Sequence, residues 1–247
     1  MSGKVSIIMP TYNSSQFICK AIDSVLAQSY ADWELIIVDD CSTDNTYQIL
    51  KDYSERDNRI IISQTEHNMG AAGARNKALS ISSGRYIAFL DSDDLWFNNK
   101  LEKQIKFMDE NNYAFTCTAY NKIDEQDNDL NFIVPSINVD YNGMLKRCPG
   151  NSTVIYDSQV LGLQQIPLIK RRNDYVLWLQ IIKTSKMLYG LDEVLSSHRV
   201  RNDSISSNKV KLVKYQWIVY RRIEKQSFIK SIYLVVYQIF KSIFKIK

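Results

Sequence analysis

The sequence predicts an α/β fold, in which one mostly parallel sheet has helices on both faces and a helical C-terminal tail follows. Over the first hundred residues, short apolar runs rich in β-branched side chains alternate with segments of helical periodicity. Strand–helix–strand units of this spacing form right-handed crossovers, which make the strands parallel and cover both faces of the sheet. Residues 209–247 differ, since they carry ten Lys or Arg side chains and a single acid, Glu224.

The predicted strands are short apolar runs of the kind that is buried on both faces of a sheet. The first four cover residues 5–9, which end at Pro10, 35–38, which end at Asp39, 59–62, and 86–90, which end at Asp91. After residue 112 the pattern is less regular. We expect two further strands there, over residues 113–119 and 152–156.

The predicted helices lie between these strands. The first has Ser14 and Ser15 as candidate caps and runs to residue 26, the second has Ser42 and Thr43 as candidate caps and runs to residue 54, the third covers residues 70–80, and a later one covers residues 174–184. The third consists mainly of small residues, which allow close packing of a helix on a sheet. We find no internal repeat and no low-complexity stretch.

The composition is that of an ordinary globular chain of 247 residues. Its 45% apolar and 23% charged residues exclude general disorder, and its eight Gly and four Pro exclude collagen-like and linker-rich classes. The four cysteines have no CxxC spacing and there are only two histidines, which argues against a zinc cluster or a disulfide scaffold. The N-terminus lacks the apolar region of a signal peptide, so we expect a cytoplasmic body with reduced thiols.

Polar clusters follow the predicted strands at residues 11–13, 39–40, 68–70 and 91–94. In open α/β sheets, ligands bind beyond the carboxyl ends of the strands. Asp91 and Asp93 can converge on a hard cation such as Mg²⁺ or Mn²⁺, although a helix cap or an acidic turn explains a short pattern equally well. Asp39-Asp40 and Asp91–Asp94 both follow strands of one predicted sheet, and this position favours a nucleotide-diphosphate site. There Asp39 can accept a uracil imide N–H, Asp91 can hold a ribose hydroxyl, and Asp93 can ligate the metal.

Four segments carry a resemblance to a known family: SIIMPTYNSSQFICKAIDSVLAQSY, WELIIVDDCSTDNT, HNMGAAGARNKAL and GRYIAFLDSDDLW. They resemble the nucleotide-binding half of the family-2 glycosyltransferases, which have the glycosyltransferase A fold and transfer a sugar from a nucleotide with inversion. The resemblance covers residues 3–110 and continues more weakly to residue 207. It implies a nucleotide-sugar half (1–110) and an acceptor half of the same domain (111–207), and the charge pattern adds a basic amphipathic tail (208–247).

The resemblance also assigns roles to single residues. It places Pro10, Thr11, Tyr12, Asp39, Arg75, Asp91 and Ser92 around the nucleotide, and Asp93 on a Mn²⁺ or Mg²⁺ ion. The run from Asp91 to Asp94 is also similar to bacterial O-antigen enzymes that transfer glucose or galactose in β-1,3 linkage.

Inverting transfer needs a base that takes the proton of the acceptor hydroxyl. Asp174 matches the acid of the family motif (E/D)D-Y-x-L-W, and we expect it to be this base. The alternative is that Asp174 only caps the helix that it begins. This chain departs from the family at Asn173, where the motif often has an acid.

A second departure lies near residue 200, where many members have Tyr-Arg-x-His and the histidine helps to bind the metal or the diphosphate. Here Arg199 matches the arginine, Arg201 takes the place of the histidine, and His198 takes that of the tyrosine. A guanidinium cannot ligate a cation, but it can bind a diphosphate with two hydrogen bonds. We therefore expect a metal held by Asp93 and the diphosphate, with Arg201 on the diphosphate and His198 structural.

The tail has the pattern of an amphipathic helix from Ser227 onward. Its polar side chains fall within an arc of about 120° and the rest of the helix is almost wholly apolar; they are Ser227, Lys230, Ser231, Gln238, Lys241, Ser242 and Lys245. We expect this helix to lie in the interface of an anionic membrane, and the alternative is packing on the body or on a partner. Spanning is not expected, because Lys230 and Lys241 bracket too short an apolar run.

Together these features predict a metal-dependent inverting enzyme that moves a hexose from a UDP-sugar to a lipid-diphosphate-linked saccharide in O-antigen or surface polysaccharide biosynthesis. It would be peripheral on the inner face of the bacterial cytoplasmic membrane. Nothing in the body resembles a reader of bases, so nucleic acid is not an expected partner. Two alternatives stay open: a nucleotidyltransferase, and a non-catalytic carbohydrate-binding membrane scaffold.

Overall fold

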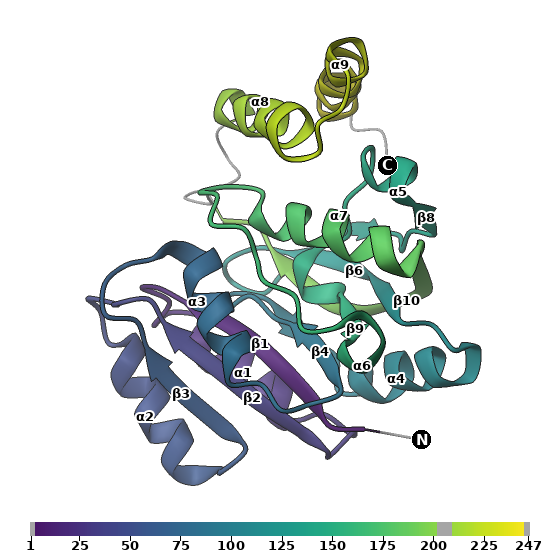
Figure 1. The fold of residues 1–247 in the computed structure, drawn as a ribbon. Coiled ribbons are helices and arrows are strands. Elements are labelled where there is room, and N and C mark those ends of the chain that lie inside the picture. Colours follow the sequence, from purple (N-terminus) through teal and green to yellow (C-terminus); the bar gives the residue numbers. More distant parts are fainter. Residues whose placement is uncertain (1–2, 202–208, 245–247) are drawn as a thin grey trace.

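A ten-stranded sheet forms the centre of the protein in a computed structural model, which describes residues 3–201 and 209–244 (Figure 1). Its strand order is β3-β2-β1-β4-β9-β6-β10-β5, with β7 paired to β6 and β8 paired to β10. The strands β3, β2, β1 and β4 are parallel, as are β6 and β10, and the remaining pairings are antiparallel. The predicted α/β fold with a mostly parallel sheet is confirmed.

The strands are β1 (Val5–Thr11), β2 (Trp33–Asp39), β3 (Ile60–Gln64), β4 (Tyr86–Phe89), β5 (Leu95–Trp96), β6 (Phe115–Ile123), β7 (Asp129–Val134), β8 (Val139–Asp140), β9 (Ile155–Asp157) and β10 (Met187–Arg199). The helices of the body are α1 (Ile18–Leu26), α2 (Thr46–Arg56), α3 (Gly70–Ser80), α4 (Lys100–Asn111), α5 (Tyr141–Met144), α6 (Ser158–Leu161) and α7 (Asn173–Ser185), with a short 3₁₀ turn η1 (Asn151–Thr153). The tail consists of α8 (Lys209–Ile218), a π-helical turn η2 (Val219–Ile223) and α9 (Phe228–Phe244).

Alternate residues of the buried strands feed two separate cores. Ile8 of β1 and Val38 of β2 pack with α3 and α7 on one face of the sheet. Ile7 and Ile37 point to the other face, where they pack with α1, α2 and α4. This alternation is what a strand with helices on both sides requires.

The first strand runs past Pro10, where the apolar run predicted its end. Pro10 is paired in register with Val38 of β2, whereas β4 stops pairing with β1 at Ile8. The carbonyl of Ile8 accepts a bond from Leu90 on the β4 side, so the missing N–H of Pro10 faces the same side after β4 has ended. The proline therefore removes no bond from the sheet.

Three local predictions need correction. Residues 152–154 do not form a strand, because η1 occupies residues 151–153 and β9 begins only at Ile155. Neither Ser14 nor Ser42 caps its helix, since α1 and α2 begin later, after Phe17 and Asn45. The helix α7 begins at Asn173 after a left-handed Arg172, so Asp174 lies in its first turn and is not its N-cap.

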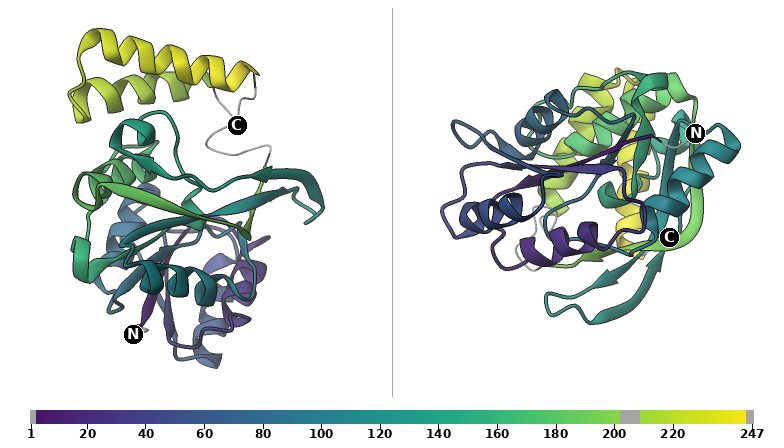
Figure 2. Two further views of the ribbon diagram at one scale, coloured as in Figure 1. Left: turned by 90° about the vertical axis from the view of Figure 1, so that its right-hand side faces the viewer. Right: turned by 90° about the horizontal axis from the view of Figure 1, so that it is seen from below.

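The tail lies against one end of the body, where α8 and α9 run side by side in both figures (Figures 1 and 2). Its acid, Glu224, is buried and accepts hydrogen bonds from Tyr141 (2.5 Å) and Lys183 (3.0 Å). Gln238 of α9 donates to the carbonyl of Lys146 at 3.1 Å, and Leu234 of α9 belongs to the core on the α7 side.

The tail therefore packs on the body through part of its polar arc, and it leaves apolar side chains exposed. Ser231 is fully buried, whereas Ile229 is 80% exposed and Ile232 and Val236 are also exposed. Of the predicted arc, Lys245 lies outside the described residues, as does the predicted boundary between residues 207 and 208. Among the described residues, no helix combines the length and hydropathy needed to cross a membrane.

Candidate active site

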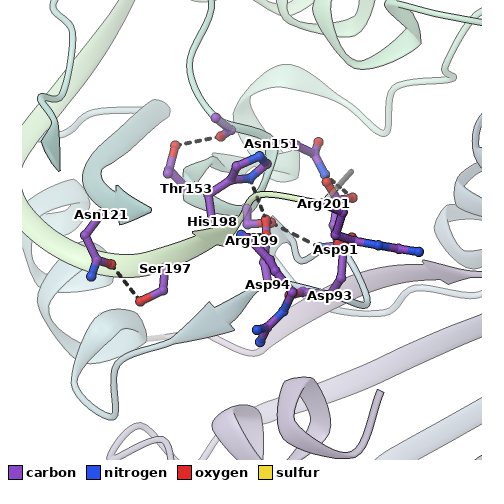
Figure 3. Close-up of polar contacts among 12 residues, drawn as sticks. Asp91, Asp93, Asp94, Asn121, Asn151, Thr153, Ser197, His198, Arg199 and Arg201 are labelled. Carbon is purple, nitrogen blue, oxygen red and sulfur yellow. Dashed lines mark hydrogen bonds and ion pairs between the residues drawn. The ribbon is translucent and has the colours of Figure 1, made fainter. Parts of the chain in front are cut away.

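The predicted site residues meet at the carboxyl ends of β1, β2 and β4. Pro10 and Thr11 end β1, Tyr12 follows it with about half of its surface exposed, and Asp39 ends β2. Residues 91–94 form a turn after β4, which faces η1 and the end of β10 (Figure 3). The parallel arrangement of these strands brings side chains together that are far apart in the sequence.

Asp91 is the centre of a network that joins three elements. Its Oδ1 accepts hydrogen bonds from Arg75 of α3 at 2.6 Å and from Asn151 of η1 at 2.8 Å. The other arm of the Arg75 guanidinium donates to Oδ1 of Asn173, in the first turn of α7, at 2.9 Å. Burial raises the pKa of Asp91, against the effect of Arg75. Arg75, which the resemblance places around the nucleotide, is thus buried and bonded to Asp91.

The side chain of Asp93 is more exposed than those of Ser92 and Asp94, and it points toward Arg201. Arg201 donates to Oδ2 of Asp93 at 3.2 Å, and its guanidinium lies over the ring of Phe17. Burial, together with the nearby Asp94 and Asp91, raises the pKa of Asp93 to about 6. A second cation at this position, such as a metal ion, would relieve the same repulsion among the carboxylates.

Asp94 has a structural role that the sequence did not reveal. Its two oxygens accept bonds from the hydroxyl of Ser152 (2.5 Å), the backbone N–H of Arg199 (2.9 Å) and Nδ1 of His198 (3.2 Å). The attraction between the two side chains raises the pKa of His198 to about 9. It also lowers the pKa of the Asp94 carboxyl, in spite of the burial that acts to raise it. The pair fastens the end of β10, and with it Arg201, to the turn after β4.

Asp39 and Asp40 lie at the end of the site where the nucleotide is predicted to bind. Asp39 is buried and accepts bonds from the backbone N–H of Ser42 (3.0 Å) and from Gln64 (2.9 Å). Asp40 accepts from the backbone N–H groups of Met69 and Gly70 at the start of α3. Beside them the hydroxyl of Thr11 is buried without a partner among the described residues. Such an orphaned polar atom is what an unfilled ligand site leaves behind.

Ser92 and Asp174 complete the set of predicted residues. The hydroxyl of Ser92 lies 2.9 Å from that of Ser14, so the turn after β4 is joined to the loop after β1. Asp174 lies in the first turn of α7, one residue after the Asn173 that contacts Arg75. Its carboxylate is close enough to Asp91 to raise the pKa of Asp91. The predicted base therefore borders the predicted nucleotide site.

Three aromatic side chains that follow or lie near the site residues in sequence belong to the core, so they are not available to stack on a sugar. Trp96, Trp178 and Tyr175 are all buried. Trp178 packs edge-on against Phe89 with ring centroids 5.0 Å apart, and the indole N–H of Trp96 donates to the carbonyl of Ser152.

Asp91 and Asp93 are the residues suited to hold a divalent metal. No group of three or more His, Cys, Asp or Glu ligands is gathered in the part of the chain that the structure describes. Mg²⁺ and Mn²⁺ are commonly bound by one or two carboxylates, with phosphate and water supplying the other oxygens. The residues therefore fit a metal that arrives with a nucleotide diphosphate.

The sequence reasoning missed Asn151, Ser152 and Asn173 as supports of the site. Asn151 and Ser152 contact Asp91 and Asp94, and Asn173 contacts Arg75. The signal for the first two was the polar run from Gly150 to Thr153 directly before an apolar strand. Nothing in the sequence marked the contact across α3 and α7.

Comparisons with known proteins identify the class of protein. Residues 6–161 match the family model for glycosyl transferase family 2. The chain is 45% identical over 234 residues to TuaG of Bacillus subtilis, a glycosyltransferase assigned to teichuronic acid biosynthesis, with 94% of this chain and 93% of TuaG covered. The chain therefore belongs to glycosyl transferase family 2, as its motifs predicted.

A second relative has a more specific name. The UDP-Glc:α-D-GlcNAc-diphosphoundecaprenol β-1,3-glucosyltransferase WfgD of Escherichia coli is 42% identical over 235 residues, which are 94% of this chain and 91% of WfgD.

Solved structures confirm the glycosyltransferase A fold. TarS of S. aureus in complex with UDP-GlcNAc matches with a TM-score of 0.72 at 23% identity, covering 89% of this chain and 67% of the TarS chain. The mannosyltransferase PcManGT of Pyrobaculum calidifontis, with GDP-Man and Mn²⁺, matches with a TM-score of 0.71 at 17% identity, covering 92% and 66%.

Proposed function

We propose that this glycosyltransferase moves a hexose, glucose or galactose, from a UDP-sugar to a sugar carried on a lipid diphosphate, with inversion and in β-1,3 linkage, during surface polysaccharide assembly. The observation that carries the proposal is the juxtaposition of Asp174 with the Asp91 network, because it sets a free carboxylate beside a nucleotide site. The names of WfgD and WfaP, both UDP-Glc:α-D-GlcNAc-diphosphoundecaprenol β-1,3-glucosyltransferases, support the donor, acceptor and linkage.

The nucleotide would lie across the ends of β1, β2 and β4. The Asp39 carboxylate would accept a hydrogen bond from the uracil imide N–H, and Asp91 would accept one from a ribose hydroxyl. The base and the ribose would be lined by Pro10, Thr11 and Tyr12. Asp93 would hold Mn²⁺ or Mg²⁺, which supplies positive charge to the departing diphosphate. In this arrangement Arg201 would release Asp93 and donate hydrogen bonds to the diphosphate instead, which a guanidinium can bind with two parallel bonds.

The chemical step needs one proton transfer and one displacement. Asp174 takes the proton of the acceptor hydroxyl as its oxygen attacks the anomeric carbon from the face opposite the diphosphate. The bond between that carbon and the diphosphate oxygen breaks, UDP departs, and the configuration inverts. Arg75 supports this step indirectly, since it joins Asp91 to the helix that carries Asp174.

We also propose that the enzyme acts at the inner face of the cytoplasmic membrane, as a peripheral protein. The exposed apolar side chains of α9, among them Ile229, Ile232 and Val236, support this location. So do the basic residues of the tail, because anionic lipid attracts them.

Replacing Asp174 tests the function directly. With UDP-glucose, Mn²⁺ and a GlcNAc-diphosphate-lipid acceptor, we expect Asp174→Asn to lower kcat by about 10²–10⁴-fold, because the amide cannot take the proton. The dissociation constant for UDP should stay unchanged. Asp192→Asn is the matched control, since Asp192 is an exposed carboxylate on β10 and should not affect turnover.

Three outcomes would contradict the proposal. Near-normal turnover of Asp174→Asn would remove Asp174 from the mechanism. Release of pyrophosphate rather than UDP would identify a nucleotidyltransferase. Sugar binding without turnover of any UDP-sugar would identify a non-catalytic scaffold.

A further inference from the structure

Three cations from three separate elements gather beside Asp174. They are Arg147, in the loop after α5, Arg172, which precedes α7, and Lys241, in the last turns of α9. They are 25 or more residues apart in sequence, so the fold brings them together.

Hydrogen bonds to one short segment, residues 144–146, fix this convergence. The hydroxyl of Tyr175, in the first turn of α7, donates to the carbonyl of Met144 at 3.1 Å. Tyr220 of η2 donates to the carbonyl of Leu145 at 2.7 Å, and Gln238 of α9 donates to that of Lys146 at 3.1 Å. Arg147 directly follows this segment, Lys241 lies one helical turn after Gln238, and the guanidinium of Arg172 lies 5.7 Å from the ring centre of Tyr175.

None of the three cations has an acidic partner in the part of the chain that the structure describes. Within residues 3–201 and 209–244, no ion pair and no side-chain hydrogen bond involves Arg147, Arg172 or Lys241. The Nε atom of Arg172 is buried without any partner, and its backbone has a φ of 63°. Burial and the neighbouring Arg147 lower the pKa of Lys241. Unpaired like charges, one of them partly buried and strained, need an anion to be stable together.

The position of the cluster relates it to both halves of the proposed reaction. Cys148, the neighbour of Arg147, is close enough to Asp174, Arg172 and Lys241 for each charge to affect its pKa. Asp174 in turn affects the pKa of Asp91. The geometry agrees, because Arg172 and Asp174 flank Asn173, which bonds to Arg75 beside Asp91. On α9, Phe240 next to Lys241 is an exposed apolar side chain.

We propose that Arg147, Arg172 and Lys241 bind the diphosphate of the lipid-linked acceptor and thereby place the acceptor sugar against Asp174. This inference rests on the proposed function, since it names where that substrate is held. In a sugar linked to a lipid diphosphate, the sugar and the lipid lie on opposite sides of the anion. The cluster has a suitable neighbour for each part, because Arg172 lies two residues before Asp174 and Lys241 follows Phe240, an exposed apolar side chain of α9.

Two acceptors that carry the same sugar test this assignment. One has GlcNAc on a lipid diphosphate, and the other has GlcNAc on an uncharged alkyl chain of equal length. We expect the double variant Arg147→Gln/Lys241→Gln to lower the ratio of kcat/KM for the charged acceptor over the uncharged one by about ten- to a hundredfold, as lost charge-assisted bonds imply. Lys106→Gln is the control, because Lys106 is an exposed cation on α4 and should leave the ratio unchanged.

A binding measurement separates this inference from the proposed function, because it needs no turnover. Farnesyl diphosphate in neutral detergent is titrated into the full chain with UDP at saturation, so that the donor site is occupied. We expect weaker binding in the double variant and in Arg172→Gln, with recovery in Arg172→Lys, which keeps the charge. Binding by a chain that makes no product from any UDP-sugar would support the cluster and refute the proposed function.

Two results would overturn the inference. One is an unchanged acceptor ratio in a folded double variant that turns over, whether both acceptors keep their kcat/KM or lose it equally. The other is a double variant that loses only its binding to phosphatidylglycerol vesicles, which would make the cluster a contact for bulk lipid headgroups.

Discussion

Adjacent carboxylates at the turn after β4 have opposite surroundings. Asp94 is buried and has the hydroxyl of Ser152, the backbone of Arg199 and the ring of His198 as partners. Asp93 is partly accessible and has Arg201 as its side-chain partner among the described residues. Asp94 thus holds the turn together, whereas Asp93 is the carboxylate to which we assign the metal in the proposed function.

Replacing each by asparagine should separate the two roles. We expect Asp93→Asn to abolish Mn²⁺-dependent binding of UDP with an unchanged Tm, because a ligand is lost and no buried contact is broken. Asp94→Asn should lower the free energy of unfolding by about 1–3 kcal/mol, because charge-assisted bonds to a buried group are lost. UDP titration with Mn²⁺ or EDTA, together with thermal unfolding, measures both. Equal effects of the two substitutions, or Asp93→Asn activity in excess EDTA, would refute the division.

Lys100, at the start of α4, is a fully buried cation outside the site. Its Nζ donates to Gln104 at 2.7 Å and lies 4.2 Å from the ring centre of Trp96. Burial lowers the pKa of Lys100 to about 7, from 10.5. Between these values the unfolded chain keeps a proton that the folded chain releases, so the free energy of unfolding increases with pH across this window.

Lys100→Met should therefore stabilise the protein, most strongly at and below pH 7. We expect a gain of about 1–4 kcal/mol at pH 6, the range found when buried charges are replaced by apolar groups. The gain should shrink toward pH 10, where the lysine is neutral in the folded state. Urea unfolding at several pH values measures it, with the exposed Lys106→Met as control. Destabilisation at pH 6 would mean that the contacts to Trp96 and Gln104 outweigh the buried charge.

The site carboxylates could be predicted from single residues because they follow directly on buried strands. What could not be predicted is which of the three carboxylates is held by partners in the protein and which is left accessible to a ligand. Asp91, Asp93 and Asp94 have the same chemistry and neighbouring positions, and their partners Arg75, Ser152 and Arg201 come from α3, η1 and the end of β10. Those contacts depend on how the sheet and its helices pack, which the local sequence does not specify.

At the scale of elements, the small-residue helix α3 matches its predicted range, residues 70–80. Its start is marked by Gly70, whose φ of 74° favours glycine. The predicted strand over 152–156 was wrong in its first half, because the side chains of Asn151 and Ser152 bond to the turn after β4 and bend the backbone into η1. A pattern of apolar residues does not contain that tertiary constraint.

The tail has one acid, Glu224, which bonds to two side chains of the body. Glu224 accepts bonds from Tyr141 and Lys183 on the body, and Gln226 donates to the same Tyr141 hydroxyl at 2.8 Å. A buried carboxylate that loses its partners is costly, and so are partners that lose their carboxylate.

Glu224→Ala should loosen the tail without unfolding the sheet. We expect faster trypsin cleavage within residues 209–247 and faster amide exchange in α9, while strands β1, β2 and β4 keep their protection. Glu193→Ala is the matched control, because Glu193 pairs with Lys103 at the surface and such pairs contribute little. Unchanged cleavage of the tail would show that its apolar contacts, such as that of Leu234, hold it alone.

At the scale of the molecule, the proposed functional groups come from several elements. The proposed nucleotide site lies at the ends of β1, β2 and β4, the proposed base Asp174 is in the first turn of α7, and the proposed acceptor cluster joins α7 to α9, which has exposed apolar side chains. The amphipathic pattern of the tail predicted both a polar and an apolar face. It could not predict which way each face turns: Gln238 of the polar arc bonds to the carbonyl of Lys146 on the body, whereas Ser231 is buried and its hydroxyl bonds within the tail to Ser227.

This orientation decides how membrane binding should be tested. Deleting residues 227–247 would remove Leu234 and Gln238 from their contacts on the body, so a loss of binding would be confounded by damage to the fold. Substitutions on the exposed face avoid this difficulty. The triple variant Ile229→Ser/Ile232→Ser/Val236→Ser changes side chains that are already exposed, so its Tm should equal that of the parent chain.

We expect this triple variant to lose most of its binding to vesicles that contain phosphatidylglycerol, because each apolar side chain contributes about 1.5–3 kcal/mol when fully buried. High salt should weaken the parent chain only in part, since salt screens the contribution of the basic residues and leaves the apolar one. Transfer to an acceptor embedded in vesicles should fall far more than transfer to a short-chain acceptor in solution. The matched control is Val160→Ser/Leu163→Ser/Leu168→Ser, which removes exposed apolar side chains from the body. If both triple variants co-sediment with vesicles like the parent chain, α9 is not the membrane contact, and its apolar face must be covered by something other than lipid.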